Sequence, residues 1–359
     1  MFCIRNHRVV SASSLQFEPG MCVPTAIGHS PGSPGYWRRR ANSRNQTGSC
    51  CSPSACLLRA TLLALLCLAT AIADAGILSE WNLLVATDVF TTSHVDGSAK
   101  IGGNLTANGG IFSMHGVTAP GNTGLAVGGN ISAGNLQINN GGNVRLQGSQ
   151  TGTVILNGGG TTIVDPTVKA GVTAAFSYLE SLSLIFSEMV SNGTLDNGGN
   201  LNAVPTLLDG QLVAIYDLST TDFTGKAQLN LNLGTAQTVI LNVTSPTGIV
   251  NLQAPPNLIG GFSQNNSSRI LWNFPNATEI TVNNTFNGAL LAPHADLIAL
   301  GGGLNGTVAV HSLSNHNAEI RRFNYTGYVP PVPEPSSYVL AGMAALVMIP
   351  WACRLSSAA

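Results

Sequence analysis

The chain has 359 residues, with 15 Lys and Arg, 16 Asp and Glu and a formal net charge of −1 at pH 7. Charged residues make up 9% of the sequence, whereas about 25% is usual for a soluble domain. So few basic residues argue against a nucleic-acid-binding protein, which needs clustered Lys and Arg to neutralise phosphates. Hydrophobic residues make up 44%, which argues against a largely disordered chain, because disorder combines low hydrophobicity with high charge.

The first segment, residues 1–56, is rich in Ser, Pro and Arg and shows no hydrophobic periodicity. A signal peptide begins with a short basic region rather than with a stretch of this length. We therefore interpret this segment as a disordered extension, or as sequence upstream of the true translation start.

A signal peptide is predicted over residues 57–75. Arg59 provides a short positive flank, and residues 60–73 form an apolar stretch. This stretch is short for a membrane span but typical of a signal peptide. Two overlapping A-x-A cleavage sites follow, formed by Ala71, Ala73 and Ala75. The sequence thus predicts export across the inner membrane, with signal peptidase as a partner.

The central domain, residues 76–328, contains no cysteine, which excludes Cys-ligated metals and a Cys nucleophile there. Its apolar segments are short and are separated by Gly and Asn, which tolerate the positive φ of tight corners. A Gly-Gly-Asn-apolar motif recurs at residues 102–105, 128–131, 141–144 and 198–201.

The spacing of these segments predicts a mostly β fold, a parallel β-helix (β-solenoid). Residues 288–292 and 306–310 align with an offset of 18, which suits one rung of such a stack. Strands within 125–131, 143–146 and 153–156 would supply the inward apolar side chains, and Asn side chains would form ladders at the corners. A β-sandwich is the alternative, because it too consists of short strands joined by turns.

One segment, residues 167–190, has helical rather than strand periodicity. Its apolar residues are Val172, Phe176, Leu179, Leu182, Phe186 and Val190. Asp165 and Pro166 suit the N-cap and first position of a helix, and Asn192-Gly193 suits its end. We predict one amphipathic α-helix that flanks the stack.

Several polar residues could in principle ligate a metal. The histidine candidates are His94 with Asp96, His294 with Asp296, His311 and His316. No Glu stands beside these histidines at the helical spacing of a zinc protease. Asp88, Asp96 and Asp165 are too isolated for a repeated calcium site.

A catalytic centre is not indicated either. The densest acidic set, Asp209, Asp217 and Asp222, could serve a glycosidase only as a pair of carboxylates across a cleft, and we interpret these residues as turn residues. The chain has no Gly-x-Ser-x-Gly elbow and no phosphate-binding loop. We predict no enzyme, no cofactor and no catalytic or metal-binding residue.

Three stretches of the central domain are similar to one family: residues 83–104, residues 270–277 and residues 286–327. They resemble the opening, the central motif and the ending of the choice-of-anchor A domain. The resemblance spans nearly all of the central domain. It implies an adhesive β-solenoid at the cell surface that pairs with various anchors, and it implies no catalytic residues.

The C-terminal end consists of a Pro-rich linker, residues 329–337, and a hydrophobic segment, residues 338–359. The linker contains Val332-Pro333-Glu334-Pro335, and Arg354 follows the apolar run. These parts, in this order, resemble the PEP-CTERM sorting signal of Gram-negative bacteria. The resemblance implies recognition by an exosortase membrane protease, with transient membrane anchoring. One Arg where several are common is a departure from that pattern.

The sequence favours an exported, non-catalytic adhesin at the cell surface or in the extracellular matrix, with an extracellular polysaccharide or matrix polymer as partner. The alternative is an ice- or polysaccharide-binding protein that uses a flat Thr/Asn face, since a solenoid with a helix alongside also resembles one ice-binding family. Regular Thr-x-Thr ranks are missing, because Thr151-Gly152-Thr153 stands alone. A carbohydrate-active enzyme is the third and least favoured interpretation.

Overall fold

The computed structural model describes residues 76–332, except for residue 224 and residues 254–255. All of these belong to the second of two compact units of the chain, Ala60–Ala359. The predicted extension, the signal peptide with its cleavage sites, and the sorting segment lie outside the described residues, so these assignments stay predictions. Val332 is described, and it packs against a buried apolar cluster.

The described strands form a parallel β-solenoid, as the sequence predicts. One sheet has 22 strands and a second has four. Among the described strands, antiparallel pairing is confined to β12 with β13 and β14 with β15. The β-sandwich alternative is therefore wrong, because a sandwich consists of two antiparallel sheets.

The large sheet wraps around the core as three faces, named here a, b and c. Face a consists of β1 (Leu83–Val85), β4 (Ala99–Ile101), β7 (Thr123–Val127), β9 (Asn143–Leu146), β11 (Thr162–Val164), β14 (Thr206–Leu208), β15 (Gln211–Ser219), β17 (Thr238–Thr244), β20 (Ile270–Asn273) and the first parts of β23 (Ala289–Ala299) and β25 (Val308–Asn315). Face b consists of β2 (Val89–Thr91), β5 (Leu105–Asn108), β18 (Ile249–Leu252), β21 (Glu279–Val282), the first parts of β8 (Ile131–Ile138) and β10 (Gln150–Leu156) and the second parts of β23 and β25.

Face c and the remaining elements complete the described chain. Face c consists of β3 (His94–Val95), β6 (Ile111–Phe112), β22 (Phe286–Asn287), β24 (Gly303–Asn305), β26 (Glu319–Arg321) and the second parts of β8 and β10. The small sheet consists of β12 (Gly193–Leu195), β13 (Asn200–Ala203), β16 (Gln228–Leu231) and β19 (Asn257–Gly260). The helices are α2 (Ile77–Glu80), α3 (Val168–Glu188) and the 3-10 turns η1 (Pro120–Asn122), η2 (Thr220–Phe223) and η3 (Gln264–Arg269).

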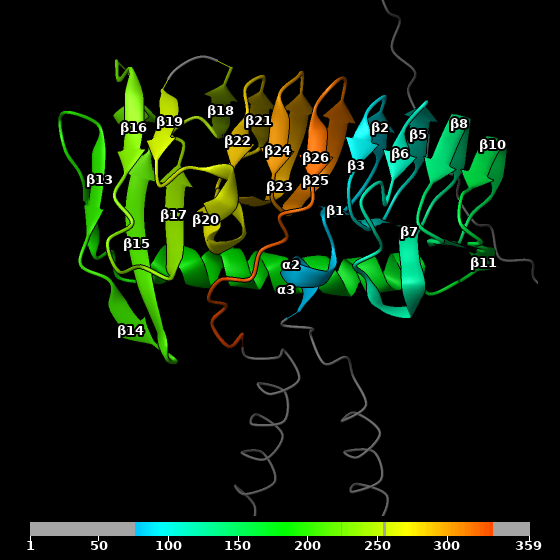
Figure 1. The fold of residues 1–359 in the computed structure, drawn as a ribbon, viewed down its shortest axis with the longest axis horizontal. Coiled ribbons are helices and arrows are strands. Elements are labelled where there is room, and N and C mark those ends of the chain that lie inside the picture. The colour runs from blue at the N-terminus through cyan, green and yellow to red at the C-terminus, as the bar shows by residue number, and fades with distance from the viewer. Residues whose placement is uncertain (1–75, 224, 254–255, 333–359) are drawn as a thin grey trace, which may run out of the picture. The chain divides into compact units, whose positions relative to one another are not determined.

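The coils do not stack in chain order. From the first coil, β1 to β3, the chain winds outward to β11, and α3 then runs back along the stack to its other end (Figure 1). The second half winds inward from there until β25 pairs with β1 and β2, and β26 pairs with β3. The first coil therefore lies in the middle of the stack, between the last coil and the second. This contact between the first and last coils is called the seam below.

Asn82 crosses the seam from the first coil, and its side chain is fully buried. Its Nδ2 donates hydrogen bonds to the carbonyl oxygens of Gly306, at 3.0 Å, and Arg321, at 3.1 Å. Its Oδ1 accepts one from the Gly97 N–H at 3.0 Å. One amide thus bonds three backbone groups, of which the Arg321 carbonyl also accepts the Phe323 N–H.

The helix α3 covers face a. Buried side chains of the helix, among them Phe176, Leu179 and Phe186, form one apolar cluster with outward side chains of face a such as Leu84 and Leu291. By length and composition alone, α3 is also the one described helix that could cross a membrane.

The helix was predicted slightly too long. It begins at Val168 and ends at Glu188, rather than spanning residues 167–190. The N-cap is Thr167 rather than Asp165, so the predicted cap was two residues too early. Asp165 still supports the start of the helix, because its Oδ1 accepts hydrogen bonds from the N–H and hydroxyl of Thr167. These bonds, the side-chain one first, lower the pKa of Asp165. Val190 is 87% exposed, so its assignment to the apolar face was wrong.

A buried polar ladder fixes the helix on the second half. Asn273 Nδ2 donates to the Ser183 carbonyl at 2.8 Å and to Asn242 Oδ1 at 3.0 Å. Asn242 Nδ2 in turn donates to the Phe186 carbonyl and to Asp217 Oδ1. Each buried amide finds its partners in the helix and in the neighbouring coil, which sets both the position of α3 and the register of the coils.

The Gly-Gly-Asn motif builds one corner of the first half. A ladder of hydrogen bonds joins successive coils at this corner. Asp88 Oδ1 accepts the N–H of Asn104, Asn104 Oδ1 accepts that of Asn130, and Asn130 Oδ1 accepts that of Ser149. These are the predicted ladders. A Cβ at Gly129 would lie 2.5 Å from the Gly103 carbonyl oxygen and 2.7 Å from Asn104 Oδ1, so only glycine leaves space for the neighbouring backbone and the ladder.

The spacing between equivalent residues reflects the length of one coil. Leu290 pairs with Val308, which confirms the offset of 18 as one rung. The first two Gly-Gly-Asn motifs, at 102–105 and 128–131, are also one rung apart, because Ile101 pairs with Val127 just before them. The motif at 141–144 belongs to a different corner, where Asn143 Oδ1 accepts the N–H of Thr161.

We expect Gly129→Ala to lower the free energy of unfolding by about 1–3 kcal/mol, because overpacking of this corner displaces the ladder. Gly171→Ala is the matched control: its Cβ would meet nothing nearer than Lys100 Nζ at 3.7 Å. Since Gly171 is helical, in the first turn of α3, this change should stabilise the chain by roughly 0.5–1 kcal/mol. Urea unfolding of both variants checks this, and equal midpoints would contradict it.

A second prediction concerns the seam. Asn82→Ala removes three hydrogen bonds at once, two of them buried, and should lower the free energy of unfolding by roughly 3 kcal/mol or more. Asn317→Ala, an exposed position in the turn before β26, should change it by less than about 0.5 kcal/mol. Denaturant unfolding again provides the measurement, and a small loss for Asn82→Ala would show that the seam tolerates open polar groups.

Candidate binding surface

The outward side of face b carries a row of side chains in register. Phe90 pairs with Thr106, Thr106 with Ser132, and Ser132 with Thr151. Neighbouring rungs of a sheet are about 4.7–4.9 Å apart, so the row repeats at that spacing. Thr106, Ser132 and Thr151 are exposed, whereas the alternate residues such as Leu105 are fully buried in the core.

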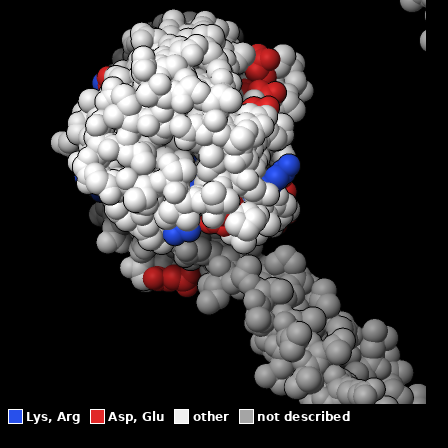
Figure 2. All heavy atoms as spheres, turned by 90° about the vertical axis from the view of Figure 1, so that its right-hand side faces the viewer, with Lys and Arg blue, Asp and Glu red and all other residues white. Residues whose placement is uncertain are grey.

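This part of face b is neutral. Strands β2, β5, β8 and β10 contain no Lys, Arg, Asp or Glu, and they lie side by side in Figure 1. The corner ladder from Asp88 through Asn104 and Asn130 runs beside the row and fixes the strands against one another. Figure 2, which views the stack from the β10–β11 end, shows an end surface that is mostly uncharged. The result is a rigid, neutral surface of hydroxyl, amide and methyl groups, called the neutral row below.

On the other side of the seam, face b carries charged residues. Thr281 pairs with Ile298, and Ile298 with Ser314, but Glu279 and Asp296 lie in the adjacent row. Asp296 Oδ1 accepts hydrogen bonds from the Ser312 hydroxyl at 2.6 Å and pairs with His311 Nδ1 at 3.0 Å. The Ser312 bond, followed by the His311 bond, lowers the pKa of Asp296.

The structure separates the histidine and aspartate residues that the sequence grouped. Asp96 pairs with His115 at 2.9 Å rather than with His94, and Asp296 pairs with His311 rather than with His294. His316 lies against the Phe90 ring. Within the described ranges, no group of three or more His, Cys, Asp or Glu side chains is placed to hold a metal ion.

The acidic residues are likewise apart and engaged. Asp209 accepts a hydrogen bond from the Tyr328 hydroxyl, Asp217 from Asn242, and Asp222 from the Ser219 N–H. Asp209 and Asp222 lie in turns, as the sequence predicts, but Asp217 lies within β15 and belongs to the buried ladder, so its assignment as a turn residue was wrong.

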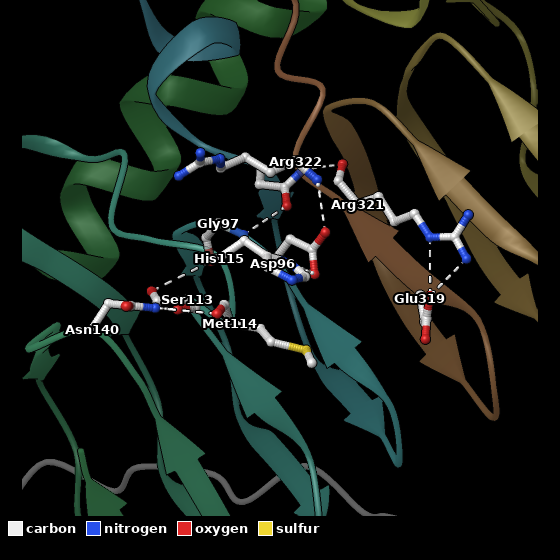
Figure 3. Close-up of polar contacts among 10 residues, drawn as sticks. Asp96, Gly97, Ser113, Met114, His115, Asn140, Glu319, Arg321 and Arg322 are labelled. Carbon is white, nitrogen blue, oxygen red and sulfur yellow. Dashed lines mark hydrogen bonds and ion pairs between the residues drawn. The ribbon is translucent and has the colours of Figure 1, made fainter. Parts of the chain in front are cut away.

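The sequence analysis missed a polar cluster at the seam, on the side of face c (Figure 3). Asp96 is nearly buried between β3 and the chain after β26; its Oδ2 accepts the Arg322 N–H at 3.2 Å while its Oδ1 binds His115. Arg321 forms an ion pair with Glu319 at 2.8 Å. The one available signal was Arg321-Arg322, the only adjacent pair of basic residues in the central domain.

Comparisons with known proteins assign the family. The model of the family described as "Putative Ice-binding-like adhesive domain" matches residues 74–322. This chain belongs to that family. The family is adhesive and ice-binding-like, which fits the expectation of an adhesive β-solenoid; the choice-of-anchor A and PEP-CTERM resemblances stay predictions. The search of curated proteins gave no match.

Three solved structures show similarity to this member of the ice-binding-like adhesive family. An ice-binding protein from the Antarctic ascomycete Antarctomyces psychrotrophicus is 13% identical, with 69% of this chain and 97% of that chain covered and a TM-score of 0.29. A glycosylated ice-binding protein from an Arctic yeast is 12% identical, covering 74% and 97% with a TM-score of 0.29. A domain of a Shewanella frigidimarina ice-binding protein is 12% identical, covering 72% and 98% with a TM-score of 0.26.

The Asp296 contacts give a pH prediction. Because the folded pKa of Asp296 lies below its ordinary value of 3.8, its stabilising contribution is present above that value and is lost as the pH falls through the folded pKa. Ser312→Ala should raise the pKa of Asp296 and cost at most about 1 kcal/mol near neutral pH, since the carboxylate is 59% exposed. Ser314→Ala should leave it unchanged. NMR titration of the Asp296 carboxylate measures both, and an unchanged pKa in Ser312→Ala would contradict this account.

Proposed function

We propose that this chain is an extracellular adhesive protein and that its neutral row binds ice. The observation that carries the proposal is the in-register row Thr106, Ser132 and Thr151 on strands without charged residues. Membership of an ice-binding-like adhesive family supports it. The proposal reverses the order favoured by the sequence alone, in which a matrix polymer came first.

The chemistry of the row suits an ordered, uncharged surface. Threonine is stiff at χ1, so its methyl and hydroxyl groups keep one arrangement. The coils are fixed by backbone pairing and by the corner ladder, so little conformational freedom is lost on binding. Hydroxyl groups and bridging water can then match a regular array of hydrogen-bonding partners, each rung adding a small contribution.

We further propose that the chain reaches the cell exterior by the predicted signal peptide and is sorted at its C-terminus by an exosortase-type protease. The resemblance of residues 332–354 to a PEP-CTERM signal supports this route. Mass spectrometry of the cell-associated protein tests it: loss of Arg354 from the mature chain is expected, and an intact C-terminus would contradict cleavage.

The ice proposal predicts the effect of a single charge. Thr106→Lys places a long, strongly hydrated cation in the centre of the row and should remove most of the thermal hysteresis and ice shaping of the chain. Thr194→Lys, an exposed strand position in the small sheet, is the matched control and should leave both unchanged. Thermal hysteresis measured on a cooling stage provides the readout.

Two results would count against the proposal. Absence of ice shaping by the unmodified chain at micromolar concentration would exclude ice as the ligand. Equal loss in Thr106→Lys and Thr194→Lys would show that binding does not use the neutral row.

A further inference from the structure

The polar cluster at the seam borders a hollow of about 400 Å³ on the side of face c. Residues from three segments line it: Asp96 and His115 from the first coils, Gln264 from η3, and Arg321 and Arg322 from the end of the last coil. It is separate from the neutral row and differs from it in chemistry, since four charged side chains and an imidazole surround it.

The two carboxylates of this hollow are already engaged. Asp96 accepts hydrogen bonds from the Arg322 N–H and from His115 Nδ1, and its side chain is only 12% exposed. Glu319 accepts two hydrogen bonds from Arg321, at 3.0 Å from Nε and 2.8 Å from Nη2. Both carboxylates are therefore bound to hydrogen-bond donors of the protein. They compete little with an anionic ligand for the Arg322 guanidinium.

The Arg322 guanidinium, in contrast, has no hydrogen-bond or ion-pair partner among residues 76–332 as described, and the side chain is exposed. It extends away from the Arg321–Glu319 pair in Figure 3. Its five N–H donors form a fixed fork that matches a carboxylate in a bidentate manner. A charged donor without a partner at the edge of a hollow is the kind of group that binds an anionic ligand.

Two glycines leave the space that the Arg321 and Arg322 side chains occupy. A Cβ at Gly116, where φ is +127°, would lie 2.5 Å from Arg322 Nη1, and a Cβ at Gly303 would lie 3.0 Å from Arg321 Nη1. Each guanidinium thus packs against the backbone of a glycine. This packing restricts the two long side chains before a ligand binds, so less conformational entropy is lost on binding.

The rest of the lining suits a sugar ring. Phe323 and Met114 supply apolar surface for the C–H face of a pyranose, and Met114 is 36% exposed. The Gln264 amide and the Arg321–Glu319 pair supply donors and acceptors for hydroxyl groups. A small hollow with apolar surface and a few convergent polar groups is typical of a small-ligand site.

From this arrangement we propose that the seam hollow binds an acidic sugar residue of an extracellular polysaccharide, with the Arg322 guanidinium on the sugar carboxylate. Arg321 and Gln264 bind its hydroxyl groups, and Phe323 packs against the ring. The chain thus has a charged, localised glycan site besides the extended neutral row.

The test uses the purified full chain and polygalacturonate, with dextran as the neutral probe, measured by isothermal titration at low and high salt. We expect saturable binding of polygalacturonate that weakens with salt, and none of dextran. Arg322→Gln should weaken binding by about tenfold or more, the effect of losing a charge-assisted pair of hydrogen bonds. Arg322→Glu should abolish it.

Lys169→Gln is the matched control, because it removes the same charge from an exposed position at the start of α3; its affinity should equal that of the unmodified chain. An unchanged urea midpoint and unchanged thermal hysteresis in Arg322→Gln would show that fold and neutral row are intact. The proposal is overturned if polygalacturonate does not bind, if Arg322→Gln binds as well as the unmodified chain, or if Lys169→Gln loses as much. Equal affinity for dextran sulfate and polygalacturonate would also overturn it, since that indicates unspecific charge attraction.

Discussion

The parallel pairing of β25 with β1 and β2 joins two half-solenoids. Without this pairing, each half would end in an unpaired sheet edge. Unpaired edges are costly when buried and prone to aggregation when exposed. The contacts that close them are remote in sequence, as Asn82 and Gly306 are 224 positions apart. Contacts this remote close long loops, and a fold dominated by such contacts is expected to form slowly.

The seam also divides the chemistry of the surface. On one side of it the outward row of face b lies on strands without charged residues; on the other, Glu279 and Asp296 lie in the row adjacent to it. On the side of face c the seam brings Asp96 and Arg322 together, 226 positions apart. An adhesive protein gains from this combination, because an extended surface with weak contacts at each rung and a localised charged site can act together. Simultaneous engagement raises the avidity far above that of either contact.

Local features of the sequence predicted much of the fold. The offset of 18 was a true rung, because coils of equal length place equivalent residues above one another. The Gly-Gly-Asn corners were recognised because glycine and asparagine have a local backbone reason to occur there. The helix was found from its period, with ends wrong by one or two residues, since Asn192 and Gly193 serve the next strand rather than the helix end.

What the sequence could not reveal were contacts decided by the long-range order of the coils. Nothing local shows that the first coil lies in the middle of the stack. Nor does sequence spacing show that Asp96 and Asp296 each pair with a histidine of the neighbouring coil rather than with the histidine two residues away. For the same reason the hollow around Arg322 was missed: its residues converge only once the seam has closed.

A composition rich in Gly and Asn is easily taken for flexibility, but here it produces rigidity. At Gly129 the absence of a side chain leaves space for the Asn104 ladder, and at Gly116 it leaves space for the Arg322 guanidinium. In both places glycine allows a polar group to be held by its neighbours. A group held in this way loses little freedom when a ligand arrives, so more of its interaction energy remains for affinity. The glycines that close the corners thus also prepare the neutral row and the seam hollow for binding.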